Sequence, residues 1–198
     1  MKGMLVIISG PSGSGKGTVV KRLDPKRNYA LSISVTTRPP RDGEMDGRDY
    51  FFCTLEKFEY MRDNNQLLEH ALYCSHFYGT PRNYVEEQIK RGKAVVLEIE
   101  VNGALQVREK FEDAVLIFLM PPTLADLHSR LMRRNTEDAD TIEDRIKRAH
   151  EEIKLISKYD YLVINDKVAD AVNHINTIVD AESLKPSRNQ DAIKHFKG

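Results

Sequence analysis

The chain has 198 residues, which suits a single domain with a substantial buried core and leaves little room for two independent domains. Lysine plus arginine and aspartate plus glutamate each number 30, so the formal net charge is zero. A protein that coats nucleic acid usually carries a marked basic excess, so this balance argues against bulk nucleic-acid binding. Any anionic ligand must therefore be bound by a local cluster of cations.

The sequence predicts neither a disulfide framework nor a membrane segment. Its two cysteines, Cys53 and Cys74, are far apart and lack the spacing of a redox or metal motif, which favours a reducing compartment. The first apolar run covers only residues 4–8 and is too short for a signal sequence or a membrane span. We therefore expect a cytoplasmic protein that binds no membrane.

Short apolar runs rich in Val, Ile and Leu alternate with longer segments of helical pattern. In chain order, we predict a strand over residues 4–8, a helix over 16–23, strand-like pieces over 29–35, 50–54 and 66–73 with a helix over 55–64, a helix over 81–91, a strand over 94–99, a helix over 103–110, a strand over 114–120, helices over 123–133 and about 139–157, a strand over 161–164 and a helix over 169–184. Continuous apolarity is typical of strands that are covered by helices on both faces, so the class is α/β with a parallel sheet.

Two segments depart from this alternation. Residues from about 28 to 78 contain strand-like pieces separated by turn residues such as those at 40–43, which predicts a small β-rich insertion. Residues 135–141 are polar and lie between an arginine-rich helix end and a new helix, which predicts a mobile lid over about 134–145. The predicted core is then about 1–27, 79–133 and 146–198.

A glycine-rich loop follows the first strand directly and precedes a helix. It reads Gly10, Pro11, Ser12, Gly13, Ser14, Gly15, Lys16, Gly17, Thr18 and matches the G-x-x-x-x-G-K part of the phosphate-loop pattern. Such glycines let backbone N–H groups converge on phosphate oxygens, and the lysine can reach the β and γ phosphates of a nucleoside triphosphate. A merely tight glycine turn is the alternative, but the strand before it and the helix after it favour phosphate binding.

The loop departs from the general pattern at Gly17, where a Ser or Thr hydroxyl would otherwise bind Mg²⁺. Mg²⁺ keeps several waters and takes much of its coordination from substrate phosphates, so this change need not abolish metal use. The G-K-G-T sequence is similar to loops of adenylate kinases. It indicates a nucleoside monophosphate kinase without choosing the acceptor.

The acceptor is indicated by residues 34–52, S-V-T-T-R-P-P-R-D-G-E-M-D-G-R-D-Y-F-F. This segment closely resembles the T-T-R-x-x-R-x-G-E-x-x-G-x-x-Y-x-F signature of guanylate kinases, and the resemblance continues at 68–69, 77–81, 97–100 and 159–166, over nearly the whole chain. It implies a phosphate-loop fold with a GMP-binding insertion and a lid, and the Mg²⁺-dependent transfer of a phosphoryl group from ATP to GMP in purine nucleotide metabolism. The oligomeric state, monomer or homodimer, is left open.

The resemblance implies a role for each matching residue. Arg38, Arg41, Tyr50 and Tyr78 would hold the GMP phosphate, and two guanidinium groups on one turn suit the bidentate capture of a phosphate monoester. Ser34, Glu69 and Thr80 would recognise guanine. These residues could instead have purely structural roles. The two arginines would then form ion pairs with nearby acids such as Asp42 and Glu44, and the two tyrosines would pack in the core.

Chemistry supports the choice of Glu69. Guanine presents N1–H and an amino group side by side, and a carboxylate is the matching double acceptor. Adenine would leave a partly buried carboxylate unpaired, and sites of this kind discriminate by roughly 10⁴ or more. Ser34 and Thr80 hydroxyls can donate to the guanine O6. Without the surrounding motif, a glutamate in a strand would more often be a solvated surface residue.

Further charged residues complete the expected site. Glu98 and Glu100 follow an apolar strand on one face, at the end of the sheet where ligands bind, and we expect them to organise Mg²⁺ waters or the acceptor. The resemblance implies that Arg134 and Arg145 are lid arginines that close on the ATP phosphates. With Lys16 and Arg38 they form the expected catalytic set, because phosphoryl transfer needs charge neutralisation and positioning more than a general base.

Two other functions are compatible with parts of the sequence. Another nucleoside monophosphate kinase would share the G-K-G-T loop, but the acceptor signature opposes it. A guanylate-kinase-like interaction module would share the fold, but such modules usually have damaged phosphate loops, whereas this chain retains Lys16 and the loop glycines. The sequence therefore favours an enzyme.

Overall fold

A computed structural model describes residues 2–24, 27–73, 75–132 and 139–197. Its main sheet has five parallel strands in the order β2-β7-β1-β8-β9. They are β1 (Met4–Ser9), β2 (Tyr29–Leu31), β7 (Ala94–Glu98), β8 (Val115–Met120) and β9 (Tyr161–Ile164). The predicted α/β class with a parallel sheet is thus confirmed.

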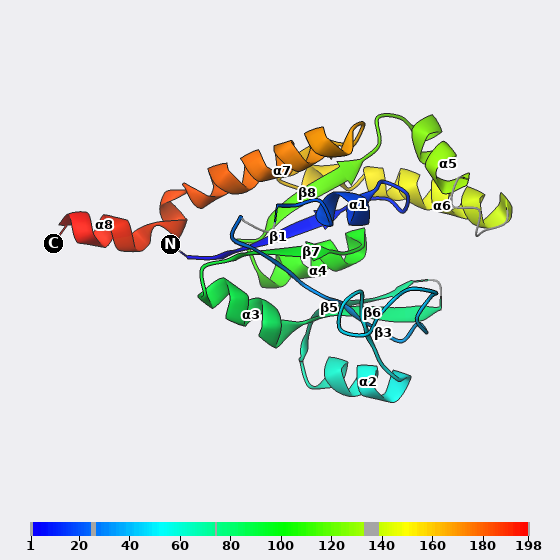
Figure 1. Cartoon of the computed structure of the whole chain (residues 1–198), viewed down its shortest axis with the longest axis horizontal. Helices are drawn as coiled ribbons and strands as arrows, with labels where there is room; N and C mark the ends of the chain where they lie inside the picture. The colour runs from blue at the N-terminus through cyan, green and yellow to red at the C-terminus, as the bar shows by residue number, and fades with distance from the viewer. Residues whose placement is uncertain (1, 25–26, 74, 133–138, 198) are drawn as a thin grey trace.

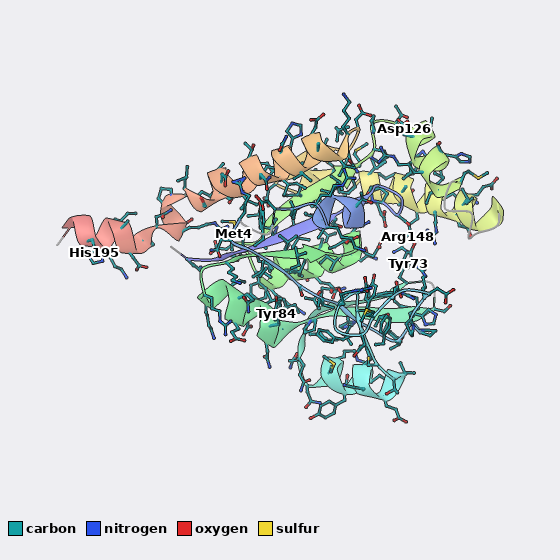
Figure 2. All side chains as sticks on the ribbon, viewed as in Figure 1. Met4, Tyr73, Tyr84, Asp126, Arg148 and His195 are labelled. Carbon is teal, nitrogen blue, oxygen red and sulfur yellow. The ribbon has the colours of Figure 1, made fainter. Side chains whose placement is uncertain are left out.

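Helices cover both faces of this sheet (Figure 1), and Figure 2 adds the side chains in the same view. Along β1, Met4, Val6 and Ile8 pack in one apolar cluster with α1 and α7, while Leu5 and Ile7 pack on the opposite face with α3 and α4. This alternation is why the strands are apolar along their whole length. The helices of the two faces are α1 (Lys16–Val20), α3 (Arg82–Lys90), α4 (Val101–Lys110) and α7 (Val168–Ser183).

A second sheet lies to one side of the first (Figure 1). It has the order β4-β3-β6-β5, in which β6 runs antiparallel to both of its neighbours. Its strands are β3 (Val35–Thr36), β4 (Phe51–Phe52), β5 (Leu67–Tyr73) and β6 (His76–Pro81), and α2 (Leu55–Asp63) packs on it through the buried Phe58.

The predicted strand over 29–35 is wrong as a single element. The chain leaves the main sheet after Ser32, whose N–H donates to the Val96 carbonyl, and joins the second sheet at Val35. The start of the segment 28–78 therefore belongs to the main sheet, and β6 extends the second sheet to Pro81. β6 itself was not predicted.

The remaining elements lie toward the C-terminal half. They are α5 (Leu124–Met132), α6 (Ala139–Ile153), the short 3₁₀ helices η1 (Ile156–Lys158) and η2 (Pro186–Arg188), and α8 (Gln190–Lys197). α5 and α6 pack through a small cluster centred on Leu127, Leu131 and Ile142. The predicted lid over 134–145 falls partly outside the described residues, because the structure describes it only from Ala139, where α6 begins.

Candidate active site

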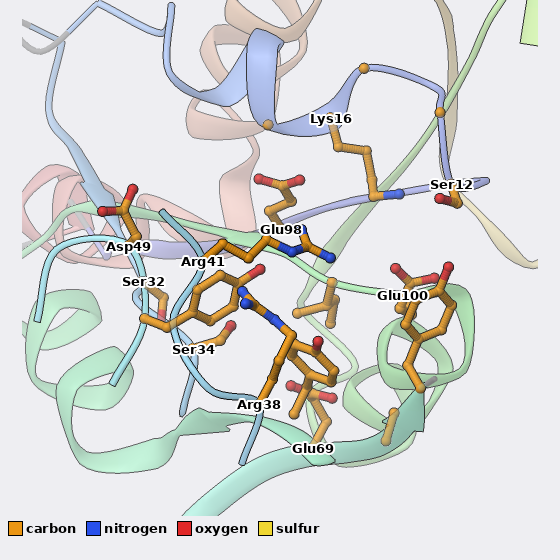
Figure 3. A pocket seen from close by; sticks show the side chains of 18 of the residues that line it. Ser12, Lys16, Ser32, Ser34, Arg38, Arg41, Asp49, Glu69, Glu98 and Glu100 are labelled. Atoms are coloured by element: carbon orange, nitrogen blue, oxygen red, sulfur yellow. The ribbon is translucent and has the colours of Figure 1, made fainter. Parts of the chain in front are cut away.

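One cavity of about 700 Å³ lies between the two sheets. The phosphate loop forms one wall, the second sheet and the loop between β3 and β4 form another, and the carboxyl end of β7 lies between them (Figure 3). The residues that line it are Ser12, Gly13, Gly15, Lys16, Gly17, Ser32, Ser34, Arg38, Arg41, Asp49, Tyr50, Glu69, Ala71, Tyr73, Tyr78, Glu98, Ile99, Glu100 and Arg145.

The phosphate loop connects β1 to α1. Gly10, Gly13 and Gly15 have φ angles of 144°, 89° and 91°, which L side chains rarely adopt. Gly10 also has no room for a side chain, since a Cβ there would lie 2.1 Å from the Leu119 carbonyl oxygen. The backbone can therefore curve tightly from the strand into the helix, with Ser12 and Lys16 reaching the cavity.

Two cations lie against the phosphate loop. Lys16 is only 8% exposed, and its Nζ donates to the carbonyls of Gly10 at 2.7 Å and Pro11 at 3.1 Å. Arg145, from α6, donates through Nη1 to the Ser12 Oγ at 2.9 Å. The structure thus brings two predicted catalytic cations, which are far apart in sequence, to one end of the cavity. Arg134 lies outside the described residues.

The other loop residues hold its shape and do not line the cavity. The Ser14 carbonyl accepts hydrogen bonds from Asn165 Nδ2 at 2.8 Å and Arg130 Nη1 at 3.4 Å, and Arg130 Nη2 also donates to the Asn165 carbonyl at 2.7 Å. Gly10 and Pro11 are buried, and Thr18 is exposed. The bracing role of Arg130 and Asn165 was not predicted, because they are more than a hundred positions away from Ser14.

The predicted GMP-phosphate residues lie together on the second wall. Arg38 is 8% exposed, and its Nη2 donates to both Oε1 and Oε2 of Glu44 at 2.9 Å. Its Cζ lies 5.4 Å from the centre of the Tyr50 ring, which in turn contacts Tyr78 edge-on at 6.0 Å. The pair with Glu44 does form, but in a largely buried place next to the cavity. Arg41 also lines the cavity.

Glu69 is a buried carboxylate that reaches the cavity. It is 3% exposed, and its Oε1 accepts a hydrogen bond from the Thr80 hydroxyl at 2.7 Å. Burial raises the pKa of Glu69 to about 7 from its ordinary value of 4.5, while Thr80 and Lys110 oppose the rise and Glu100 adds to it. Ser34 lines the cavity as well, whereas Thr80 is fully buried behind Glu69. The hydroxyl of Thr80 therefore serves the carboxylate in this structure.

Glu98 is the last residue of β7 and Glu100 lies two residues further on, directly before α4; both line the cavity as expected. A Cβ on Gly17 would lie 3.3 Å from both Oε1 and Oε2 of Glu98. The place where a Ser or Thr would project from the phosphate loop is therefore faced by a carboxylate. The Oε2 of Glu100 is buried, with no hydrogen-bond partner among the described residues. Asp49, Ser32 and Tyr73 line the cavity too and were not predicted.

In the described ranges, no group of three or more His, Cys, Asp or Glu side chains could hold a metal ion. No described helix combines the length and apolar composition that crossing a membrane requires.

The phosphate loop follows β1 and lies at one end of the cavity, and the guanidinium groups of Arg38 and Arg41 lie on the facing wall (Figure 3). Loops of this kind bind the phosphates of a nucleoside triphosphate. A second anionic substrate can be held on the facing wall. Fold and site together define a phosphate-loop kinase.

Comparison with known proteins narrows the class. The guanylate kinase family model matches residues 2–182. The guanylate kinase of Oceanobacillus iheyensis is 52% identical over 94% of this chain and 91% of that protein, and the Lactococcus lactis guanylate kinase is 49% identical over 98% and 96%. The solved structure of guanylate kinase from Anaplasma phagocytophilum is 34% identical, covers 94% of this chain and 89% of its own, and superimposes with a TM-score of 0.79. The chain belongs to the guanylate kinase family, whose members transfer a phosphoryl group from ATP to GMP.

Proposed function

We propose that this enzyme converts ATP and GMP to ADP and GDP in purine nucleotide metabolism, with both nucleotides bound in the cavity between the two sheets. The observation that supports the proposal is that two different sets of binding groups face each other across the cavity. A phosphate loop with Lys16 and Arg145 lies at one end, and the buried Glu69 lies with Arg38 and Arg41 at the other. No other described part of the chain combines these groups.

The proposed roles follow from the chemistry of each group. The phosphate loop, residues 10–18, holds the ATP phosphates, and Lys16 leaves the Gly10 and Pro11 carbonyls to reach the β and γ phosphates. Arg38, Arg41, Tyr50 and Tyr78 hold the GMP phosphate. Burial raises the pKa of Tyr50, so this phenol stays a hydrogen-bond donor.

Glu69 and Ser34 recognise the base. The ionised Glu69 accepts from N1–H and the amino group of guanine, and Thr80 keeps the carboxylate in place through the 2.7 Å bond to Oε1. Adenine offers no such pair of donors. Recognition by a buried acceptor discriminates strongly, because the wrong base leaves it unsatisfied.

The phosphoryl transfer itself needs no general base. An oxygen of the GMP phosphate is already anionic near neutral pH and attacks the γ phosphorus as the bond to the ADP oxygen breaks. Negative charge then spreads over the transferred group, and we expect Lys16, Arg38 and Arg145 to neutralise it. We expect Arg134 and the lid over 134–145 to close the site and exclude water.

Mg²⁺ is the proposed cofactor, bound chiefly through the ATP phosphates and waters. The residues at the site fit this mode, because Glu98 faces the phosphate loop beside Gly17 and Glu100 has a buried oxygen without a described partner. Mg²⁺ prefers a few carboxylates together with waters and phosphates over an all-protein cage. When bound, it neutralises the phosphate charge. Glu98 and Glu100 would orient its waters.

The proposed setting is the cytoplasm. The proposed substrates, ATP and GMP, both occur there. The thiol of Cys53 is free, as is usual in a reducing compartment.

The test is a steady-state assay of ATP consumption with different acceptors. We expect stimulation by GMP and not by AMP, and we expect Glu69→Gln to lower GMP activity more than about tenfold while ATP binding is retained. Glu109→Gln is the matched control, because Glu109 is an exposed glutamate on α4. Equal stimulation by AMP, or an unchanged GMP rate in Glu69→Gln, would refute the proposed base recognition.

A further inference from the structure

One face of α4 lies against the strand that carries Glu69. Gly103, Gln106 and Lys110 are spaced three and four residues apart, so they lie on the same side of the helix. Each of the three contacts β5 at Leu68, Glu69 or His70. The helix therefore meets β5 at the carboxylate and at both of its neighbours.

β5 needs support at this point. It is an edge strand of the second sheet, with β6 on one side only. Its pairing with β6 also shifts register between Leu67 and His70, so the ladder is irregular where Glu69 lies. A bulge of this kind re-aims a side chain but leaves backbone groups without ladder partners. The sheet alone does not fix the direction of the Glu69 carboxylate.

Side chains of α4 take the place of the missing strand. The Gln106 amide forms two bonds with one residue, since its Oε1 accepts from the His70 N–H at 3.3 Å and its Nε2 donates to the His70 carbonyl at 2.9 Å. The Lys110 Nζ donates to the Leu68 carbonyl at 2.8 Å. The backbone is thus held immediately before and immediately after Glu69.

Gly103 leaves the space on the α4 side that the Glu69 carboxylate occupies. A Cβ at this position would lie 2.6 Å from Oε2 of Glu69 and 3.2 Å from its Cδ. The nearest atoms belong to the end of a side chain, so an added methyl group would displace the carboxylate and leave the helix backbone intact. With Thr80 bonded to Oε1 on the other side, the carboxylate is held between the second sheet and α4.

We propose that Gln106 and Gly103 are specificity-determining positioning residues: α4 aims the Glu69 carboxylate at the guanine. This inference rests on the proposed function, in which Glu69 recognises the base. Neither residue is among those that line the cavity. Gln106 fixes the bulged backbone, and Gly103 leaves the space that the carboxylate occupies.

Two variants test the two contacts separately. Gln106→Met keeps the length of the side chain and its helix propensity but removes both bonds to His70. Gly103→Ala favours the helix while it crowds Oε2 of Glu69. The assay measures KM for GMP, KM for ATP and the ratio of the GMP and AMP rates. Thermal unfolding of each variant checks whether the fold is kept.

We expect Gly103→Ala to raise KM for GMP about tenfold, the change for weakening one hydrogen bond to a charged group, and Gln106→Met to raise it several-fold. KM for ATP should change less than about twofold, because a general loss of structure would affect both substrates. Glu109→Gln, the control on the exposed side of α4, should leave both KM values unchanged.

A double-mutant cycle separates this inference from the proposed function. In the Glu69→Gln background, Gly103→Ala should add little further loss of GMP preference, because the group that it displaces is already impaired. Unchanged GMP kinetics in both Gly103→Ala and Gln106→Met, with GMP preference still lost in Glu69→Gln, would overturn the α4 proposal and leave the proposed function intact. An unaltered Glu69→Gln enzyme would overturn both.

Discussion

Replacing Glu69 with glutamine should stabilise the protein at alkaline pH while it impairs the enzyme. The pKa of Glu69 is about 7 in the folded chain, because burial opposes ionisation, against an ordinary value of 4.5. The folded state therefore binds the Glu69 proton more tightly than the unfolded state does. The free energy of unfolding therefore falls as the pH rises from 4.5 to about 7. Above that range it stays lower by the full free-energy cost of ionising the buried Glu69.

The size of this cost follows from the two pKa values. Each pKa unit corresponds to about 1.4 kcal/mol, so ionising Glu69 costs roughly 3 kcal/mol of folding free energy above neutral pH. Glutamine keeps an oxygen for the Thr80 hydroxyl and has no charge to bury. The difference in stability between Glu69→Gln and the parent should therefore grow by roughly 3 kcal/mol from about pH 4.5 to about pH 8.

Urea unfolding of both chains across this pH range measures the difference directly, with midpoints and slopes fitted by linear extrapolation. Glu109→Gln serves as the control, because an exposed carboxylate should give a curve parallel to that of the parent. Parallel curves for Glu69→Gln and the parent would refute the reasoning, since they would mean that folding leaves the Glu69 proton unchanged.

Three further predictions concern catalysis. Because the proposed recognition of guanine needs the ionised Glu69, whose pKa is about 7, KM for GMP should rise about tenfold from about pH 8 to about pH 6. Glu69→Gln should show only the titration of the GMP phosphate. A pH-independent KM in the parent would contradict this. Lys16→Ala should lower kcat by about 10² or more in single-turnover assays with little change in KM for GMP, whereas retained turnover would exclude Lys16 from catalysis. Arg145→Ala should also lower kcat about 10²-fold, and a change confined to KM for GMP would place Arg145 at the acceptor instead.

The sequence predicted the parts of the fold that depend on local composition. Continuous apolar runs identified the strands of the main sheet other than β2, and the glycines around Lys16 identified the phosphate loop. The division of residues 29–35 between two sheets was missed, because Ala30 and Val35 are both apolar and buried, and only their partner strands distinguish them. β6 was missed for a similar reason, since its His-Phe-Tyr-Gly-Thr-Pro sequence has no clear alternation.

Within the candidate site, residue identities were more predictable than contacts. The family signature indicated Glu69 and Thr80. Only the structure shows that the two side chains are hydrogen-bonded to each other and that Thr80 is not among the residues lining the cavity. The support from Gln106 was beyond sequence reasoning, because it joins residues 36 positions apart through a bulge. Helical spacing predicts the face of the helix on which a side chain lies. It does not predict the residue that this side chain contacts, because that depends on how the elements pack.

The ion pair of Arg38 and Glu44 has a consequence for turnover. A buried guanidinium without a partner would be costly, so Glu44 keeps the empty site stable before any phosphate arrives. If Arg38 binds the GMP phosphate as proposed, the same carboxylate must give way, or share the arginine, each time GMP binds, and it can pair with the arginine again when GDP leaves. In that mode of binding, Glu44 would compete with the substrate for Arg38, which lowers the affinity for GMP and favours release of the product.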